Sequence, residues 1–242
     1  MTEKKRIFQV KNRNSLNIDR IAFFGRTYAE YMDMFDLDES LLRQGQILDC
    51  PAGASSFAAE AHKLGINVTA CDILYDLTSD ELMEKGKKDL QHVFEKFDEV
   101  THLYVWKYYK DKDGVMALRS RALEIFANDF PVGSKEGRYV QAEMPYLPFS
   151  DRTFSLVLSS NLLFLYGDRL DFDFHVACIK ELLRVCSGEV RMFPLIGLDF
   201  KPYPYLDDIL SSLDSDGIKV EIVEVPFEFQ KGANRMLKLK VI

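Results

Sequence analysis

Residues 47–61, ILDCPAGASSFAAEA, hold the side chains with the clearest chemical potential in this chain. An apolar run ends at Asp49, Gly53 follows, and Ser55 precedes an alanine-rich stretch with helical character. A strand–loop–helix corner of this kind has three chemical uses: it presents a nucleophilic serine, holds the pyrophosphate of a dinucleotide, or binds another nucleotide-type cofactor. A plain structural corner with no chemical role is the fourth interpretation.

The glycine spacing disfavours the first two uses. A nucleophile elbow has the pattern G-x-S-x-G, but here Phe57 stands where the second glycine is needed. A dinucleotide loop has the pattern G-x-G-x-x-G, which lets the backbone approach a pyrophosphate, and only Gly53 fits it. The sequence therefore argues against a serine hydrolase and against an NAD- or FAD-binding protein.

Strands and helices alternate around this corner. Short apolar runs predict five successive strands, at residues 45–50, 66–72, 138–143, 154–160 and 188–194. Helical spacing predicts helices near residues 28–35 and at 55–65, 172–186 and 205–217, and two final strands at 218–229 and 235–242. This order predicts an α/β fold: a doubly wound, mostly parallel seven-stranded sheet with a C-terminal antiparallel hairpin and a helical insertion.

The connection between the second and third strands, residues 73–137, is far longer than a crossover requires. Its charged and aromatic residues have helical patterning, including YVWKYYK at 104–110. We expect a single domain over residues 1–242, with an N-terminal helical cap segment at 1–40 and a helical insertion at 76–130. Both are expected to form a lid over the carboxyl ends of the strands, where such sheets bind ligands.

The composition of the chain argues against several classes of binding partner. The 242-residue chain has 31 Lys and Arg against 38 Asp and Glu, a net charge of −7, so it lacks the broad positive field of non-specific nucleic-acid binders. The N-terminus has no secretory apolar region and no run reaches a membrane span, which predicts a cytoplasmic protein. No C-x-x-C spacing occurs, so we expect no metal site and four free thiols: Cys50, Cys71, Cys178 and Cys186.

The opening segment resembles motif I of class I S-adenosylmethionine-dependent methyltransferases, in which an acid precedes alternating glycines. Asp49 matches the acid and Gly53 the central glycine, while Pro51 and Ser55 stand at the outer glycine positions. This cofactor has no pyrophosphate, so its loop needs less bare backbone, and proline is compatible with a negative φ. The resemblance implies cofactor contacts from Asp49, Cys50, Pro51, Ala52, Gly53 and Ser55.

Later segments resemble the other motifs of that family in the same order. Asp72 ends the second strand, where the family has an acid that accepts hydrogen bonds from the ribose, and Ile73 follows it. Glu143 and Met144 match residues that contact the adenine ring. Ile73 and Ser159, the second-last residue of the fourth strand, are also expected to contact the cofactor. The resemblance covers roughly residues 45–75 and 138–242 and implies S-adenosylmethionine as the cofactor.

The activity implied by the resemblance is methyl transfer, and we expect a small-molecule acceptor. The run (D/N)-P-P-(Y/F), which marks methylation of amino nitrogens of bases and glutamine, is replaced by Ser159-Ser160-Asn161-Leu162. The alternatives are an RNA or protein methyltransferase and a non-catalytic S-adenosylmethionine-binding protein. Neither the methyl acceptor nor the oligomeric state follows from these motifs.

The candidates for groups beside the methyl carbon come from the loop after the fourth strand. Asn161 and Tyr166 lie in that loop, and His175 lies in the first turn of the next helix; each also fits a packing or capping role. Arg26 is a candidate partner for the methionine carboxylate, and the alternative is a surface arginine. The aromatic residues at 104–109 either stack a substrate or pack the insertion onto the domain.

Overall fold

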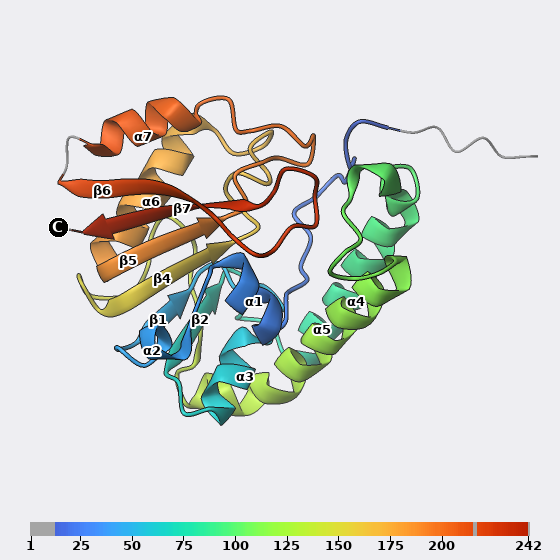
Figure 1. The fold of residues 1–242 in the computed structure, drawn as a ribbon. Coiled ribbons are helices and arrows are strands. Elements are labelled where there is room, and N and C mark those ends of the chain that lie inside the picture. Colours follow the sequence, from blue (N-terminus) through green and yellow to red (C-terminus); the bar gives the residue numbers. More distant parts are fainter. Residues whose placement is uncertain (1–12, 215–216, 242) are drawn as a thin grey trace, which may run out of the picture.

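The computed structural model describes residues 13–214 and 217–241. A seven-stranded sheet in the order β3-β2-β1-β4-β5-β7-β6 forms its centre (Figure 1). The strands are β1 (Ile47–Asp49), β2 (Val68–Asp72), β3 (Tyr139–Gln141), β4 (Phe154–Ser160), β5 (Cys186–Phe193), β6 (Ile218–Glu224) and β7 (Arg235–Val241). β1 to β5 pair in parallel, and β7 is antiparallel to both β5 and β6. The predicted fold class is confirmed.

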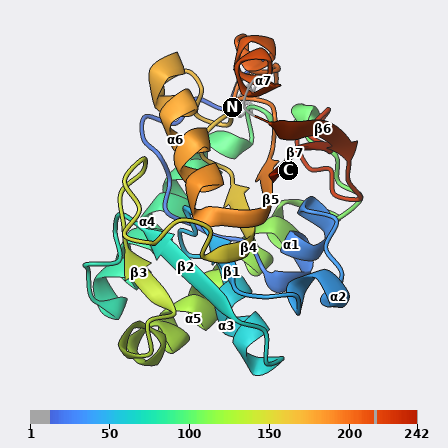
Figure 2. The same ribbon diagram turned by 90° about the vertical axis from the view of Figure 1, so that its left-hand side faces the viewer.

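Helices cover both faces of the sheet. They are α1 (Tyr28–Met34), α2 (Glu39–Leu42), α3 (Phe57–Lys63), α4 (Ser79–Phe97), α5 (Lys112–Lys135), α6 (Phe172–Val185) and α7 (Leu206–Asp214), with a 3-10 turn η1 (Thr101–Leu103). α6 and α7 lie on one face, and α1, α3 and α5 on the other (Figure 2). Because side chains alternate along a strand, Ile47 packs in the second of these layers and its neighbour Leu48 in the first.

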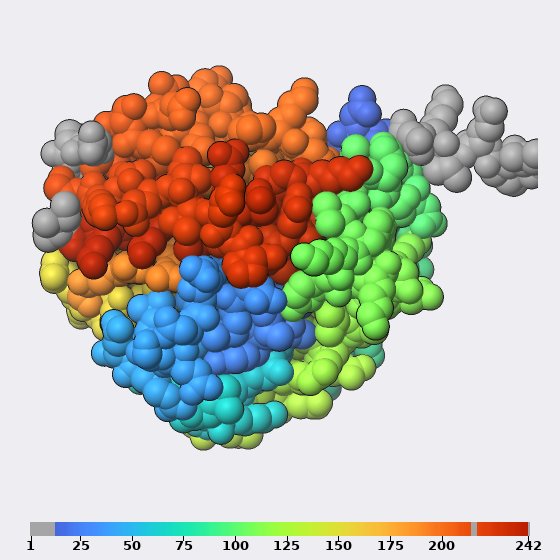
Figure 3. Space-filling model, viewed as in Figure 1, coloured from blue at the N-terminus to red at the C-terminus, as the bar shows by residue number. Residues whose placement is uncertain are grey.

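The long connection between β2 and β3 contains two helices and an irregular loop. α5 continues to Lys135, five residues past the expected end of the helical region at 130. The segment expected to be helical around residues 104–110 forms no helix beyond η1, and we call residues 98–111 the aromatic loop. Its backbone bonds instead to the hairpin loop, residues 225–234: Val105 N donates to Phe229 O (2.7 Å) and Lys231 N to Leu103 O (3.1 Å). The two loops meet at the molecular surface (Figure 3).

Residues 13–27 cross the carboxyl edge of the sheet as an extended segment, which we call the N-terminal strap. The amide of Leu16 donates to the Leu198 carbonyl (2.9 Å). The strap passes so close to the loop after β1 that a Cβ at Gly25 would lie 2.1 Å from the Ser55 nitrogen, so only glycine fits. α1 and α2 follow the strap and supply the helices expected in the N-terminal segment, whose residues 1–12 lie outside the described part of the chain.

Candidate functional site

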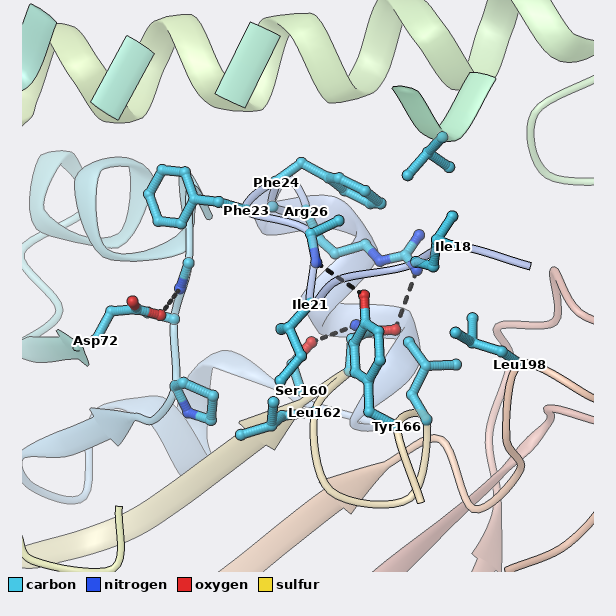
Figure 4. Close-up of a pocket in the computed structure, with 18 of the residues that line it drawn as sticks. Ile18, Ile21, Phe23, Phe24, Arg26, Asp72, Ser160, Leu162, Tyr166 and Leu198 are labelled. Atoms are coloured by element: carbon cyan, nitrogen blue, oxygen red, sulfur yellow. Dashed lines mark hydrogen bonds between the residues drawn. The ribbon is translucent and has the colours of Figure 1, made fainter. Parts of the chain in front are cut away.

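A cavity of about 510 Å³ lies at the carboxyl ends of β1, β2 and β4, where the strand order of the sheet reverses. Open α/β sheets bind ligands at this position. The N-terminal strap, the loops after β1 to β5, α4, α5, the aromatic loop and the hairpin loop all contribute to its walls. Figure 4 shows the strap running from Ile18, on the side of Leu198, past Tyr166 to Phe23, on the side of Asp72.

The loop after β1 supplies the base of the cavity. Residues 50–53 line it, and the Cys50 amide donates to the Leu158 carbonyl of β4 (2.9 Å), which holds the loop against the sheet. Gly53 has φ +56°, a left-handed conformation that favours glycine. The Gly53 amide donates to the Asp72 carboxylate (3.0 Å), and the Tyr75 hydroxyl donates to the Gly53 carbonyl (2.7 Å). The loop is therefore fixed from both sides before any ligand binds.

Asp72 places a fixed carboxylate at the end of β2. One oxygen accepts from Gly53 N and the other from Leu74 N (3.0 Å). Burial raises the pKa of Asp72, and the two backbone hydrogen bonds oppose that rise because they favour the charged form. Each oxygen keeps capacity for a further hydrogen bond, and the residue lines the cavity. The geometry suits a ligand that presents hydroxyl donors.

Asp49 is a buried carboxylate with incomplete hydrogen bonding. Its exposed fraction is 0%. Oδ1 accepts from the Tyr31 hydroxyl (3.0 Å), but Oδ2 has no hydrogen-bond partner within the described residues. Burial raises the pKa of Asp49 well above its usual range. An orphaned acceptor beside the loop after β1 is a place where a cationic group would be stabilised.

The far side of this end of the cavity comes from the segment after β3. Glu143 and Met144 both line the cavity. A turn in which Tyr146 N donates to Glu143 O (2.8 Å) holds the segment, and Glu143 is exposed while Met144 is buried. Ile73, 48% exposed, forms an apolar rim beside Asp72. The site thus offers an apolar slot with an acidic edge.

A buried ionic network stands behind the strap. Glu30 is fully buried and accepts from the Arg119 guanidinium (2.6 Å), from the Tyr109 hydroxyl and, at 3.5 Å, from Arg26. Arg26 also donates to the Tyr109 hydroxyl (3.0 Å) and to Asn161 Oδ1 (3.1 Å). Two guanidinium groups share one carboxylate, so the network carries a net positive charge next to the cavity. Arg26 is not the free surface arginine of the alternative interpretation.

The catalytic candidates have different surroundings. Asn161 and Tyr166 line the cavity, and the Tyr166 hydroxyl accepts from the Ala22 amide of the strap (3.1 Å). Burial raises the pKa of Tyr166, so it stays a neutral donor. His175 is fully buried away from the cavity, with Nδ1 2.7 Å from Asp171 O and Nε2 3.0 Å from Leu163 O. Those contacts give His175 a structural role in joining α6 to the preceding loop.

Most of the residues expected at the site come together there. Those that line the cavity are Arg26, Cys50, Pro51, Ala52, Gly53, Asp72, Ile73, Glu143, Met144, Asn161 and Tyr166. Those that are buried without lining it are Asp49, Ser55, Ser159 and His175. Ser160, the neighbour of Ser159 in β4, lines the cavity because successive strand residues point to opposite faces.

Sequence reasoning expected the N-terminal segment to cover the strand ends, but it missed Arg119 and, apart from Arg26, the strap residues that line the cavity. Arg119 had a readable signal: with Val115, Ala122 and Phe126 it occupies one face of α5 at helical spacing, so an arginine stands on a buried face. The strap had none, because nothing in its residues specifies which loops it crosses. Its lining residues include Leu16, Ile18, Ile21, Ala22, Phe23 and Phe24.

Other sites have little support in the described residues. Within 13–214 and 217–241, no three His, Cys, Asp or Glu side chains gather as a metal ion would require. No helix in that part of the chain combines the length and apolar character needed to cross a membrane. The four cysteines are buried free thiols, as the spacing predicted.

Comparison with known proteins gives the chain a family. No protein-family model matches it. It is 35% identical over 229 residues to uncharacterized protein MJ0045 of Methanocaldococcus jannaschii, and the match covers 93% of this chain and 98% of that protein. The chain belongs to the MJ0045 family.

Solved structures similar to this MJ0045-family chain share little sequence with it. One is magnesium protoporphyrin IX methyltransferase (ChlM) from Synechocystis PCC 6803 with bound SAM. Its TM-score is 0.44 at 12% sequence identity, and the match covers 84% of this chain and 73% of that chain. The same protein with bound SAH gives 0.46 at 13% identity, covering 84% and 77%. A SAM-dependent methyltransferase from Aquifex aeolicus gives 0.39 at 12% identity, covering 88% and 93%.

Proposed function

We propose that this MJ0045-family chain binds S-adenosylmethionine (SAM) and transfers its methyl group to a small-molecule acceptor. The observation that carries the proposal is Asp72, a carboxylate held by Gly53 N and Leu74 N at the end of β2 and facing a cavity at the point of strand reversal. Acids at this position in related sheets accept hydrogen bonds from ribose hydroxyls. The motif order in the sequence supports the same ligand.

The residues present fit the parts of this cofactor. Asp72 suits the ribose, and the slot between Ile73 and Met144 suits the adenine ring, with Glu143 at its edge. The buried carboxylate of Asp49, behind the loop after β1, suits the cationic ammonium of the methionine tail through its charge and not by direct contact. Arg26, at the other end of that loop, suits the carboxylate.

When bound, the cofactor supplies an electrophilic methyl group on a sulfonium. This chain's own contribution is then to position an acceptor and exclude water. The strap closes one side of the cavity, since its Phe23 amide is fixed to the Asp89 carboxylate (2.8 Å) and its Ala22 amide to Tyr166. Asn161 and Tyr166 are the polar groups from the loop after β4 that face the acceptor.

Calorimetry with SAM and its demethylated product (SAH) tests the cofactor assignment. We expect dissociation constants in the micromolar range or below, and Asp72→Ala should weaken binding by about 1–3 kcal/mol through lost hydrogen bonds to a charged acceptor. Asp76→Ala, four residues further on and exposed, is the matched control and should bind as wild type. Binding of NADH without any response to SAH would refute the assignment.

Turnover separates the enzyme from a non-catalytic SAM-binding protein. The purified chain is incubated with SAM and, separately, with the small-molecule, RNA and protein fractions of a cell extract, and SAH release is measured. A small-molecule methyltransferase releases SAH with the first fraction. Release with the RNA or protein fraction alone would assign the acceptor to that class, and tight SAM binding with no release in any fraction would favour the non-catalytic protein.

A further inference from the structure

The half of the cavity remote from Asp72 is walled by aromatic rings. Ring centroids follow one another at 5.4 Å from Phe94 to Phe97, 4.5 Å from Phe97 to Tyr104, and 4.4 Å from Tyr104 to Phe229. These rings come from α4, the aromatic loop and the hairpin loop, and all four residues line the cavity. Most of the other residues that line this half are aliphatic: Leu16, Ile18, Val93, Leu165, Leu170 and Leu198. Such a wall suits a flat apolar molecule.

Three polar side chains at this end, Tyr104, Tyr166 and Arg26, carry hydrogen-bond donors. Tyr104 is only 5% exposed and lines the cavity, and its hydroxyl has no hydrogen-bond partner in the described part of the chain. Burial raises the pKa of Tyr104, the Arg26 charge opposes that rise and the nearby Tyr166 adds to it. The Tyr104 hydroxyl therefore stays protonated at neutral pH. Arg26 and Tyr166 reach into the same part of the cavity, beside Ile18 and Leu198 (Figure 4).

The charged residues around the cavity also favour an anionic group at the end remote from Asp72. Of the described residues that line it, the acidic ones are Asp72 and Glu143, both at the proposed cofactor end. The acceptor end has no lining carboxylate, and the network of Arg26, Arg119 and Glu30 beside it has one more positive than negative group. A cationic amine would find no lining carboxylate at this end, whereas an anionic oxygen would find the donors Tyr104, Tyr166 and Arg26.

We propose that the methyl acceptor is an apolar, ring-sized molecule that carries one acidic oxygen group, a carboxylate or a phenolate, and that the Tyr104 hydroxyl holds this group. The inference rests on the proposed function and names its substrate class. The acceptor oxygen attacks the methyl carbon and a C–O bond forms while the S–C bond breaks. The bonding pair leaves with sulfur, so an anion and a sulfonium become an uncharged ester or ether and an uncharged thioether.

Binding of small naphthyl probes to the SAH-loaded protein tests the substrate class. Naphthoate and naphthol carry the acidic oxygen, naphthamide and naphthylmethylamine have the same ring without it, and octanoate has the acid without the ring. We expect naphthoate or naphthol to bind at least about tenfold more tightly than the amide, the amine and octanoate. Preference between naphthoate and naphthol then assigns a carboxylate or a phenol.

Substitutions of two tyrosines in the aromatic loop distinguish a hydrogen-bonding role of the Tyr104 hydroxyl from a purely structural role. Tyr104→Phe keeps the ring and removes the donor, so affinity for the acidic probe should fall about tenfold while SAH affinity stays at the wild-type value. Tyr108→Phe is the matched control, because Tyr108 packs on Phe227 and does not line the cavity; it should change neither affinity.

The SAH titration measures binding at the cofactor end alone, so it tests the cofactor assignment separately from the acceptor class. Intact SAH binding with no binding of any naphthyl probe, with equal affinity for acid and amide, or with preference for the amine overturns the acceptor assignment alone. Octanoate that binds as tightly as naphthoate refutes the flat ring. Failure to bind SAH counts against the proposed function itself.

Discussion

Replacing Asp49 by asparagine should make the ligand-free protein more stable and its binding of SAM weaker. The Asp49 carboxylate is fully buried, accepts one hydrogen bond from Tyr31 and has one oxygen without a partner among the described residues. Asparagine keeps the acceptor for Tyr31 and removes the charge. A buried charge that lowers the stability of the ligand-free protein is expected where an oppositely charged ligand compensates it.

The size of the effect follows from the burial. An uncompensated buried charge costs several kcal/mol, and a buried amide that lacks one partner costs about 1–3 kcal/mol. The difference gives a gain of about 1–2 kcal/mol in the free energy of unfolding, which corresponds to about 2–8 °C in Tm for a chain of this size. Affinity for SAM should fall about tenfold, since a cationic ammonium loses its charged partner.

The gain should depend on pH in a defined direction. Burial raises the pKa of Asp49 in the folded protein above its unfolded value of about 3.9. Below that value the carboxyl is protonated in both states and costs nothing. As the pH rises above it, the wild type loses stability that Asp49→Asn retains, so the difference in Tm should be near zero at about pH 4 and should grow toward neutral pH.

Thermal unfolding of wild type and Asp49→Asn between about pH 4 and 8, with SAH calorimetry at neutral pH, provides the measurement. Asp76→Asn, on an exposed residue, is the control for loss of one negative charge. An asparagine variant that is less stable than wild type at neutral pH, or that binds SAH equally well, would show that the Asp49 charge is compensated in the folded protein and has no part in the site.

Three further outcomes follow from the contacts of the site. Arg119→Met should cost about 3–5 kcal/mol of stability, because it leaves Glu30 buried with less compensation, while Arg121→Met on the exposed face of α5 should change urea unfolding little. Gly53→Ala and Gly65→Ala both place alanine at positive φ and should each lower the free energy of unfolding by about 1 kcal/mol. In calorimetry only Gly53→Ala should weaken SAH binding. If the two variants bind SAH equally well, the placement of the loop after β1 at the cofactor is wrong. Hydrogen exchange should show SAH protecting the N-terminal strap and the aromatic loop as well as the loops after β1 and β2; protection confined to those two loops would mean that the insertion is not a lid.

The sheet and its helices were predictable because their signals are local. Apolar alternation and helical spacing are read within a few residues, and the alternation of elements then restricts the topology to a doubly wound sheet. The loop ends that line the cavity were predictable for a similar reason, since the carboxyl ends of parallel strands meet at one edge. Asp72 and Gly53, which the structure joins by a hydrogen bond, follow from that rule.

The aromatic loop was misread because its partners are distant in sequence. Tyr104, Trp106 and Tyr108 recur at every second residue, which is no helical spacing, and their rings pack on Phe227 and Phe229 of the hairpin loop. No pattern within the loop specifies that docking. The same holds for the individual contacts of the strap, since its hydrogen bonds to Asp89 and Leu198 join residues that are far apart in the sequence.

The walls of the cavity include both Leu16 and Gln230, so no short contiguous piece of this chain contains the site. The strap is synthesised before the hairpin loop, and until that loop is in place the aromatic loop lacks its backbone hydrogen bonds to Phe229 and Lys231. A nascent chain that lacks the last strands therefore has no closed pocket, however well its first strands have formed. Ligand affinity in this protein is thus a readout of complete folding, and a bound ligand stabilises the whole assembly of loops at once.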